Sequence, residues 1–275
     1  MFEKVNPSHP DKIADRIAGA IVDLAYAKSE NPHIAVEVLL GHGKCFIILE
    51  SDVLINRGDI NSAVKRIAGK IEAENIITVY ADQDENLNNN QQGKARCGDN
   101  GIFKPTSINK EEQELTNLAA LIYEKYPSDG KYLIDNQGII TICQSNAKAK
   151  ELYESINALH NKKRVKINPL GSWSGGSDVD SGATNRKLGS DMGSGCSGGG
   201  LHGKDLSKAD VTLNICAMLD KKEYSCSIGD EEINGKKYEE YVKRAKEYID
   251  RIGGFEKLAE WGLIRPKEIY PGYNK

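Results

Sequence analysis

One order of predicted elements occurs twice along this 275-residue chain and begins a third time. Apolar spacing and turn residues predict helix, strand, strand, helix and strand at residues of about 11–28, 33–40, 44–50, 59–71 and 76–81. The same order returns at about 110–126, 131–134, 139–143, 147–160 and 164–168. It starts again with a helix at about 206–219, a strand at 223–228 and a helix at 237–252. The sequence therefore predicts three related units of helices and strands.

The first helix is marked by Ser8 and Pro10, an N-cap residue type and a residue tolerated in the first turn. We expect an α+β fold whose three units are related by a pseudo-threefold axis. The third unit is truncated, because too few residues remain before Pro266 for a final strand. The expected division is a central unit of 1–13 with 110–170, a first unit of 14–109, and a third unit of 171–275.

The charge balance excludes a general polyanion binder with a basic surface, since 37 Lys and Arg oppose 40 Asp and Glu. A local basic pocket for one small anion stays open. No run approaches the roughly 20 apolar residues of a membrane helix, and the first residues lack the apolar stretch of a signal peptide. The six cysteines form no CxxC pair. We expect reduced thiols and a cytoplasmic protein without a membrane or nucleic-acid partner.

Residues 171–203 contain 11 of the 27 glycines and almost no apolar periodicity. Arg186 and Lys187 interrupt these glycines, and Lys204 and Lys208 follow them. Glycine lets a backbone approach a ligand closely, and exposed N–H groups and helix N-termini favour anions. The segment therefore predicts a cradle for a polyphosphate. A second polar segment, 82–101, is interpreted either as a surface loop or as a mobile lid over a site.

Candidate reactive groups gather in the run Ser8-His9-Pro10-Asp11-Lys12. Histidine can donate or shuttle a proton, aspartate can hold Mg²⁺ and lysine can meet phosphate. Taken alone, the run also fits a capped helix with solvated charges. Glu37 and Glu50 lie among apolar residues of predicted strands, where a partner cation or ligand would explain them, as would an exposed sheet face.

Four motifs follow one another in the chain. They are Ser8-His9-Pro10-Asp11-Lys12-Ile13-Ala14-Asp15, Gly98-Asp99-Asn100-Gly101, Gly175-Gly176…Asp180…Thr184-Asn185-Arg186-Lys187, and Gly203-Lys204-Asp205-Leu206-Ser207-Lys208-Ala209-Asp210. Together and in this order they resemble the S-adenosylmethionine synthetases, also called methionine adenosyltransferases. The resemblance covers about residues 3–210, and the family's three-part fold agrees with the repeat of elements.

The resemblance implies a transferase of one-carbon metabolism. The sulfur of L-methionine would attack C5′ of ATP, and the whole triphosphate would leave and be hydrolysed to pyrophosphate and phosphate. Cations and Mg²⁺ would stabilise the negative charge that develops on the leaving group. The resemblance further implies Mg²⁺ and K⁺ as cofactors, and a homodimer or higher homo-oligomer with sites between subunits.

The family's residue roles transfer to the matching positions. Catalytic roles fall on His9, Lys131, Arg186, Lys187, Lys204 and Lys208, with His9 stabilising the leaving oxygen. ATP binding is expected of His9, Lys12, Asp129, Lys131, Ser172, Trp173, Asp180, Arg186, Lys187, Gly200 and Lys204. Methionine binding is expected of Glu50, Gln83, Asp99, Asp180 and Lys208. Metal binding is expected of Asp11 and Asp210 for Mg²⁺ and of Glu37 for K⁺.

The chain also departs from the family pattern and is shorter than its members. Ser8 and Asn185 replace glycine, Asn100 replaces glutamine, and Trp173 replaces phenylalanine. These departures leave two alternatives: a catalytically degenerate paralogue that binds nucleotide, and a triphosphatase or adenosyltransferase with a different acceptor. The retained charged residues favour the synthetase.

Overall fold

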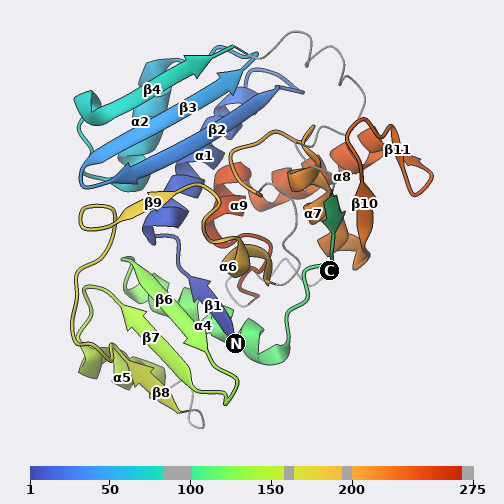
Figure 1. The fold of residues 1–275 in the computed structure, drawn as a ribbon. Helices are drawn as coiled ribbons and strands as arrows, with labels where there is room; N and C mark the ends of the chain where they lie inside the picture. The colour runs from blue at the N-terminus through green and yellow to red at the C-terminus, as the bar shows by residue number, and fades with distance from the viewer. Residues whose placement is uncertain (83–100, 158–163, 194–199, 268–275) are drawn as a thin grey trace.

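The computed structural model describes residues 1–82, 101–157, 164–193 and 200–267 (Figure 1). Its first unit contains, in chain order, α1 (Pro10–Tyr26), β2 (Ile34–Gly41), β3 (Lys44–Ser51), α2 (Arg57–Ala68), a short 3-10 helix (Ala73–Asn75) and β4 (Ile76–Ala81). Strands β2 and β3 are antiparallel, and β3 and β4 are parallel. A fourth strand, β9 (Ser181–Ala183), pairs antiparallel with β2, so the sheet order is β4-β3-β2-β9.

The second unit repeats this topology. It contains α4 (Lys110–Lys125), β6 (Gly130–Ile134), β7 (Ile140–Gln144), α5 (Ala149–Asn157) and β8 (Val165–Ile167). Strands β6 and β7 are antiparallel, and β7 and β8 are parallel. The fourth strand again comes from a distant part of the chain: β1 (Phe2–Val5) pairs antiparallel with β6. The two four-stranded sheets therefore share one plan, as the repeat of elements predicted.

The third unit is shorter. It contains α7 (Ala209–Asp220), β10 (Tyr224–Cys226), β11 (Glu232–Ile233), β12 (Lys236–Lys237) and α8 (Tyr238–Ile252). Strand β5 (Gly101–Phe103) pairs antiparallel with β10, so this pair corresponds to the β9–β2 and β1–β6 pairs. Among the described residues no further strand joins this pair, which confirms the expected truncation. The helices α6 (Leu188–Met192) and α9 (Phe255–Trp261) complete the fold.

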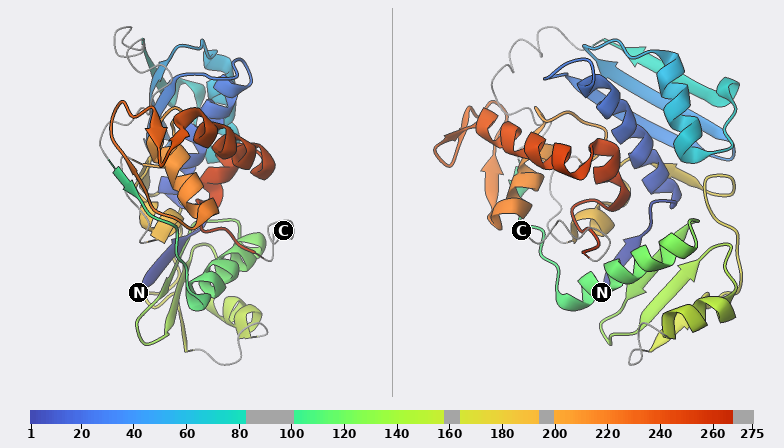
Figure 2. Two further views of the ribbon diagram at one scale, coloured as in Figure 1. Left: turned by 90° about the vertical axis from the view of Figure 1, so that its right-hand side faces the viewer. Right: turned by 180° about the vertical axis from the view of Figure 1, so that it is seen from behind.

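Each unit has its own hydrophobic cluster. The predicted apolar face of α1, with Ile13, Ile17 and Ile21, is buried in the largest cluster. Helix α9 lies close against α1, since a Cβ on Gly19 would stand 2.7 Å from the carbonyl oxygen of Phe255. The three units lie side by side around the segment that leads from β1 into α1 (Figure 2).

The buried ammonium of Lys4 joins that central segment to the C-terminal part of the chain. Its Nζ donates to the backbone carbonyls of Ser190, Trp261 and Ile264 at 2.7, 2.8 and 2.9 Å. Burial lowers the pKa of Lys4 to about 7, and in its charged form the three N–H donors meet three carbonyl acceptors. In the described ranges no helix is long and apolar enough to span a membrane.

Candidate active site

The first turn of α1 carries two of the candidate groups, His9 and Asp11. His9 is the N-cap residue, and its Nδ1 accepts a hydrogen bond from the backbone N–H of Asp11 at 3.2 Å. The expected cap, Ser8, lies one residue earlier, and its backbone N–H donates to the side chain of Asn6. The sequence prediction was therefore wrong by one residue, because an imidazole nitrogen takes the role usually filled by a hydroxyl.

Strand β9 crosses the start of α1 at very short range. A Cβ on Gly182 would lie 2.1 Å from the carbonyl carbon of Pro10, so this crossing requires glycine. The approach brings the backbone N–H of Ala183 to Oδ1 of Asp11 at 3.0 Å. The glycine-rich segment is thus fixed against the helix start that carries His9 and Asp11.

Two cations of the same segment surround Asp11. Lys187 Nζ lies 3.1 Å from Asp11 Oδ2, and Arg186 Nη1 lies 3.5 Å from Oδ1. The Asp11 side chain is buried, whereas that of Arg186 is 58% exposed. A buried carboxylate therefore holds the exposed Arg186 and the partly buried Lys187, two cations that can meet an anionic ligand.

The imidazole of His9 is kept neutral. Burial lowers its pKa to about 4; Lys187 and Lys131 add to the decrease, and Asp11 and Asp180 oppose it. Because Nδ1 accepts the Asp11 N–H, the single proton of the neutral ring lies on Nε2, which is a hydrogen-bond donor. These electrostatic effects also place Lys131 and Asp180 near His9. Lys131 lies on β6, with its Nζ 3.4 Å from Glu3.

Asp129 faces the glycine-rich segment from the turn before β6. Its Oδ2 accepts the backbone N–H of Gly176 at 3.1 Å, and a Cβ on Gly175 would lie 2.7 Å from that oxygen and 2.5 Å from the Trp173 ring. Oδ1 is buried and has no hydrogen-bond partner among the described residues. Burial raises the pKa of Asp129 to about 6, with a further contribution from Asp180. A buried oxygen of this kind is suited to a ligand donor or a hard cation.

The predicted cation Lys204 and the predicted metal ligand Asp210 form a second cluster. Lys204 Nζ lies 2.8 Å from Asp210 Oδ2. The backbone of Lys204 also forms an isolated antiparallel β-bridge with Ala35 on β2, which fixes the loop before α7 against the first sheet. Lys208, expected to contact methionine, is the half-buried N-cap residue of α7.

Lys12 occupies a different environment from the one expected for a phosphate ligand. Its side chain is fully buried, with Nζ 2.8 and 2.6 Å from the two oxygens of Asp191 and 3.0 Å from Asp15 Oδ2. Burial alone would lower its pKa, but Asp191 and Asp15 outweigh that effect and raise it. This ammonium is enclosed by its own carboxylates, so the geometry gives no support to the expected ATP contact of Lys12.

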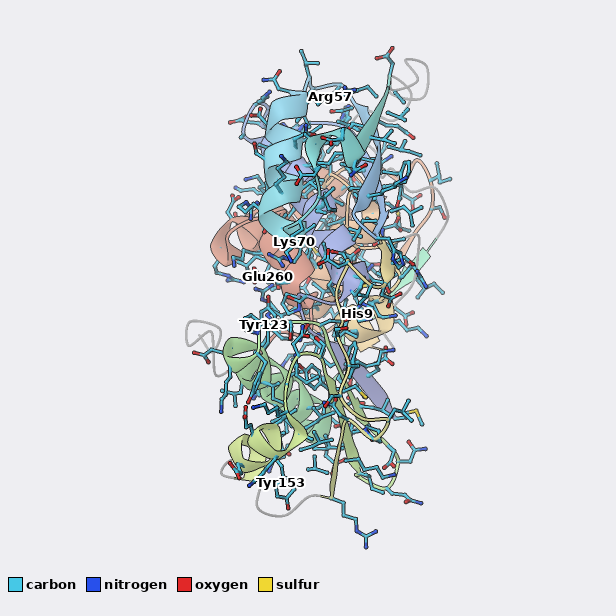
Figure 3. The ribbon with its side chains drawn as sticks, turned by 90° about the vertical axis from the view of Figure 1, so that its left-hand side faces the viewer. His9, Arg57, Lys70, Tyr123, Tyr153 and Glu260 are labelled. Atoms are coloured by element: carbon cyan, nitrogen blue, oxygen red, sulfur yellow. The ribbon has the colours of Figure 1, made fainter. Side chains whose placement is uncertain are left out.

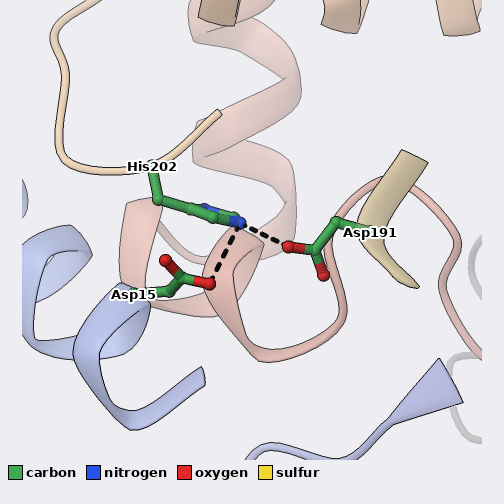
Figure 4. Close-up of side chains that lie close together, drawn as sticks. All are labelled: Asp15, Asp191 and His202. Atoms are coloured by element: carbon green, nitrogen blue, oxygen red, sulfur yellow. Dashed lines mark hydrogen bonds and ion pairs between the residues drawn. The ribbon is translucent and has the colours of Figure 1, made fainter. Parts of the chain in front are cut away.

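His202 completes this cluster, and Figure 4 shows it between Asp15 and Asp191. Its Nε2 lies 2.8 Å from Asp191 Oδ2 and 3.7 Å from Asp15 Oδ2. Two carboxylates and an imidazole this close would be suitable metal ligands. However, Lys12 Nζ also lies 3.3 Å from the same imidazole nitrogen, so the lysine already supplies the cation. The cluster does not fit a metal ion.

Asn185 is a residue whose role the sequence reasoning missed. It adopts a left-handed conformation with φ 62°, and its backbone N–H donates to Asp15 Oδ1 at 2.8 Å. Its side-chain oxygen accepts the N–H groups of Leu201 and His202, both at 2.9 Å. A Cβ on Gly200 would lie 2.6 Å from the same side chain. Asn185 therefore connects the end of the glycine-rich segment to α1. In the sequence, the only indication of this role was that Asn185 replaces a glycine of the family pattern.

The remaining candidates lie apart from His9 or outside the described residues. Glu37 and Glu50 are exposed on one face of the first sheet, where Glu37 accepts a hydrogen bond from the hydroxyl of Thr184. Ser172 is exposed near the start of the glycine-rich segment. Gln83 and Asp99 lie in the range 83–100, which is outside the described residues. The expected lid of 82–101 consists almost entirely of the same range.

One group of predicted residues therefore converges where the first and second units meet. Figure 3 shows His9 at this junction. The group comprises His9, Asp11, Asp129, Lys131, Asp180, Arg186 and Lys187, from α1, β6 and the glycine-rich segment. A neutral proton donor, three cations and three carboxylates within one neighbourhood can bind a polyphosphate and stabilise charge on it.

Comparison with solved structures identifies the fold. The chain superimposes on a protein described as an unusual S-adenosylmethionine synthetase from Campylobacter jejuni with a TM-score of 0.68, covering 97% of this chain and 95% of that one. The two sequences are 21% identical. This chain therefore has the fold of an S-adenosylmethionine synthetase.

Comparison of sequences finds similarity to the same group of proteins. Residues 1–92 match the model of the S-adenosylmethionine synthetase N-terminal domain. The S-adenosylmethionine synthase of Helicobacter pylori strain Shi470 is 25% identical over 270 residues, spanning 78% of this chain and 70% of the relative. That of Hyphomonas neptunium is 27% identical and spans 76% and 68%. The resemblance noted from the four motifs is confirmed: the chain is similar to S-adenosylmethionine synthetases in sequence and in fold.

Proposed function

We propose that this protein synthesises S-adenosylmethionine from ATP and L-methionine. The observation that carries the proposal is the convergence of His9, Asp11, Arg186 and Lys187 at the start of α1. The attacking thioether is already a nucleophile, so the reaction requires no serine or cysteine nucleophile. What it requires is stabilisation of the departing triphosphate, and this group of residues is chemically suited to that task.

In this proposal, His9 acts as a neutral donor through Nε2 toward the oxygen that leaves C5′. Lys187, Arg186 and Lys131 bind the triphosphate as it leaves and as its terminal phosphate is hydrolysed, with Lys204 and Lys208 extending the cationic surface. The ring of Trp173 lies close to Gly175 and Asp129, which supports its assignment to the adenine. Asp180, Ser172 and Gly200 complete the proposed ATP contacts, and Glu50, Gln83 and Asp99 those to methionine.

The donor chemistry also fits Mg²⁺, which would neutralise triphosphate charge when bound. Asp11 and Asp210 offer the carboxylate oxygens that hard cations prefer. In this structure those oxygens contact Lys187, Arg186 and Lys204. The unpaired oxygen of Asp129 is a further donor near the site. For K⁺, Glu37 offers a single carboxylate beside the Thr184 hydroxyl.

We further propose that the active form is a homodimer or a higher homo-oligomer with sites between subunits. The exposed face of the first sheet carries neighbouring rows of large apolar side chains: Leu39, Phe46 and Ile77, then Ile48 and Val79. Each of these five is 43–54% exposed. An apolar patch of this kind on a sheet marks a protein interface, and Glu37 and Glu50 flank it.

A cytoplasmic location is part of the same proposal, because ATP and methionine are the expected substrates. The cysteines of the described ranges, Cys45, Cys143, Cys216 and Cys226, are free thiols, which agrees with a reducing compartment.

The experiment is product analysis of the purified protein with ATP, methionine, Mg²⁺ and K⁺. Methionine-dependent S-adenosylmethionine with equal amounts of pyrophosphate and phosphate is the expected result. Phosphate release without S-adenosylmethionine would instead identify a triphosphatase or a different acceptor. Neither product, from folded protein that still binds ATP, would identify the non-catalytic paralogue.

A further inference from the structure

A cavity of about 670 Å³ lies where α7 and α8 meet the connector in front of α4. Its walls are the connector residues 105–108, the last residues of α7 and α8, and the extended segment 263–267. None of the residues assigned to ATP, methionine or metal binding lines it. Its size falls within the range of about 300–1,000 Å³ typical of small-molecule sites.

The charged side chains that line this cavity all carry the same sign. Lys221, Arg251, Arg265 and Lys267 line it, and no aspartate or glutamate of the described ranges does. The whole chain carries 40 acidic and 37 basic residues, so the lining is not an average sample of its surface. Within the described residues, Lys221, Arg251 and Lys267 form no ion pair with a carboxylate, which leaves a positive potential in a concave wall.

Helix dipoles account for only two of these cations. Lys221 is the C-cap residue of α7, and Arg251 lies in the last turn of α8, where a cation offsets the negative end of a helix. Arg265 and Lys267 belong to no helix. Arg265 is buried in the wall, and its Nη1 donates to the backbone carbonyl of Lys257 at 2.7 Å. The positive wall therefore needs another explanation than helix capping.

The remainder of the cavity is mainly apolar. Leu219 at the end of α7 is 36% exposed, although the other large side chains of the third unit's core are buried. Ile108, Met218 and Leu263 line the cavity beside it. Ser107 and Gln113 supply hydrogen-bonding groups at its edge. A ligand complementary to this surface has an anionic group and an apolar part.

We propose that this cavity is a binding site for a small organic anion, distinct from the site for ATP and methionine. The anionic group lies among Lys221, Arg251, Arg265 and Lys267, and the apolar part lies on Leu219 and its neighbours. The site stands whether or not the chain makes S-adenosylmethionine, because it shares no residue with the proposed active site.

The probe for this site is pyridoxal 5′-phosphate, an aromatic anion with an aldehyde. The aldehyde condenses with a lysine amine to an imine with loss of water, and borohydride reduces the imine to a stable secondary amine. Peptide mapping by mass spectrometry then identifies the labelled lysine. We expect saturable labelling of Lys221 or Lys267, about tenfold faster than that of the exposed Lys70 just beyond α2, because charge-assisted contacts to the phosphate group hold the aldehyde near these amines. Inorganic phosphate should slow it.

Saturating ATP separates the two sites in the same experiment. ATP should protect Lys131 or Lys187 from labelling and leave Lys221 and Lys267 labelled. If ATP protects neither Lys131 nor Lys187, and Lys221 and Lys267 are still labelled, the result argues against the proposed active site and leaves the cavity proposal standing. ATP protection that extends to Lys221 and Lys267 would overturn the claim of a distinct site.

Arg251→Glu tests the role of the cationic wall, and Arg57→Glu is its matched control. Arg57 is an exposed arginine in the first turn of α2, labelled in Figure 3, and it does not line the cavity. The selective labelling should disappear in Arg251→Glu and persist in Arg57→Glu. Non-saturable labelling at the rate of Lys70, or labelling that Arg251→Glu leaves unchanged, would overturn the proposal. If Arg251→Glu does not fold, competition by phosphate on the native chain decides: no competition rejects the site.

Discussion

At the scale of single residues, the buried charges of this protein are compensated in three different ways. Lys4 donates to three backbone carbonyls, Lys12 lies between two carboxylates, and His9 is kept uncharged by its surroundings. Burying an uncompensated charge is costly, so each arrangement is a requirement of folding. Only His9 among these three also lies beside the candidate catalytic cations.

The state of His9 gives a pH prediction. Its pKa in the folded protein is about 4, against 6.5 for an ordinary histidine. Between these values the unfolded chain binds a proton at His9 that the folded chain does not, so its contribution to stability is present above pH 6.5 and is lost as the pH falls toward 4. An NMR titration, assigned with His9→Gln, should give a midpoint near 4. A midpoint near 6.5 would contradict the buried neutral state.

Lys187 provides the test of the cationic group. In Lys187→Ala, Asp11 retains Arg186 and the Ala183 N–H, so we expect stability to change by no more than about 1 kcal/mol. The loss of a cation from the departing triphosphate should lower kcat/KM by about 100-fold or more. Steady-state kinetics and urea unfolding measure the two effects, with the exposed Lys148→Ala as control. An inactive variant that is also unfolded would mean that Lys187 is structural.

At the scale of elements, strands of three or four residues decide how the units are joined. The strands β1, β5 and β9 each add to a sheet whose other strands are far away in sequence. Each contributes only a few backbone hydrogen bonds, so its position depends on what packs beside it. For β9 that neighbour is the start of α1, which it meets at Gly182.

Gly182→Ala should therefore disrupt both the fold and the site. The added Cβ has no space beside Pro10, and the backbone shift should cost about 2 kcal/mol or more and move Ala183 away from Asp11. Gly189→Ala in α6 is the control, since a Cβ at that position would meet no described atom within 4 Å, and it should be neutral or slightly stabilising. Urea unfolding and the synthesis assay compare them. Equal stability of the two variants would reject this account of the crossing.

At the scale of the whole molecule, two complete units and one truncated unit surround the segment from β1 to α1 (Figure 2). The helices α1 and α2 cover only one face of the first sheet (Figure 1). The other face exposes Leu39, Phe46, Ile48, Ile77 and Val79, a pattern that a monomer in water does not require. The proposed dimer removes this face from water.

Ile48→Glu tests that surface, because Ile48 lies at the centre of the apolar rows between Glu37 and Val79. A buried like charge beside Glu37 should shift a dimer toward monomer and reduce activity in parallel. Leu54→Glu is the control, since Leu54 is 79% exposed outside the strands. Sedimentation equilibrium measures the molar mass of both variants. An Ile48→Glu protein that sediments like the native dimer would place the interface elsewhere.

The sequence by itself determined the elements whose signal is local and periodic. The strand at 76–81 was predicted at its observed bounds, and α4, β2 and β3 within a residue or two of theirs. Amphipathic spacing over ten or more residues, or a strand pattern over six to eight, specifies which face is buried. The motifs likewise predicted that His9, Asp11, Arg186 and Lys187 share one site, and the structure brings these four residues together.

Only the tertiary structure decided what depends on distant parts of the chain. Strands of three or four residues carry too short a pattern to be recognised, and β1, β5 and β9 form because a sheet edge more than a hundred residues away offers them partners. Lys12 reads in the sequence as a solvated or phosphate-binding cation, yet Asp191, 179 residues later, encloses it. Burial and pairing are set by the whole packing, so residue type alone cannot distinguish a charge that binds ligand from one that holds the core together.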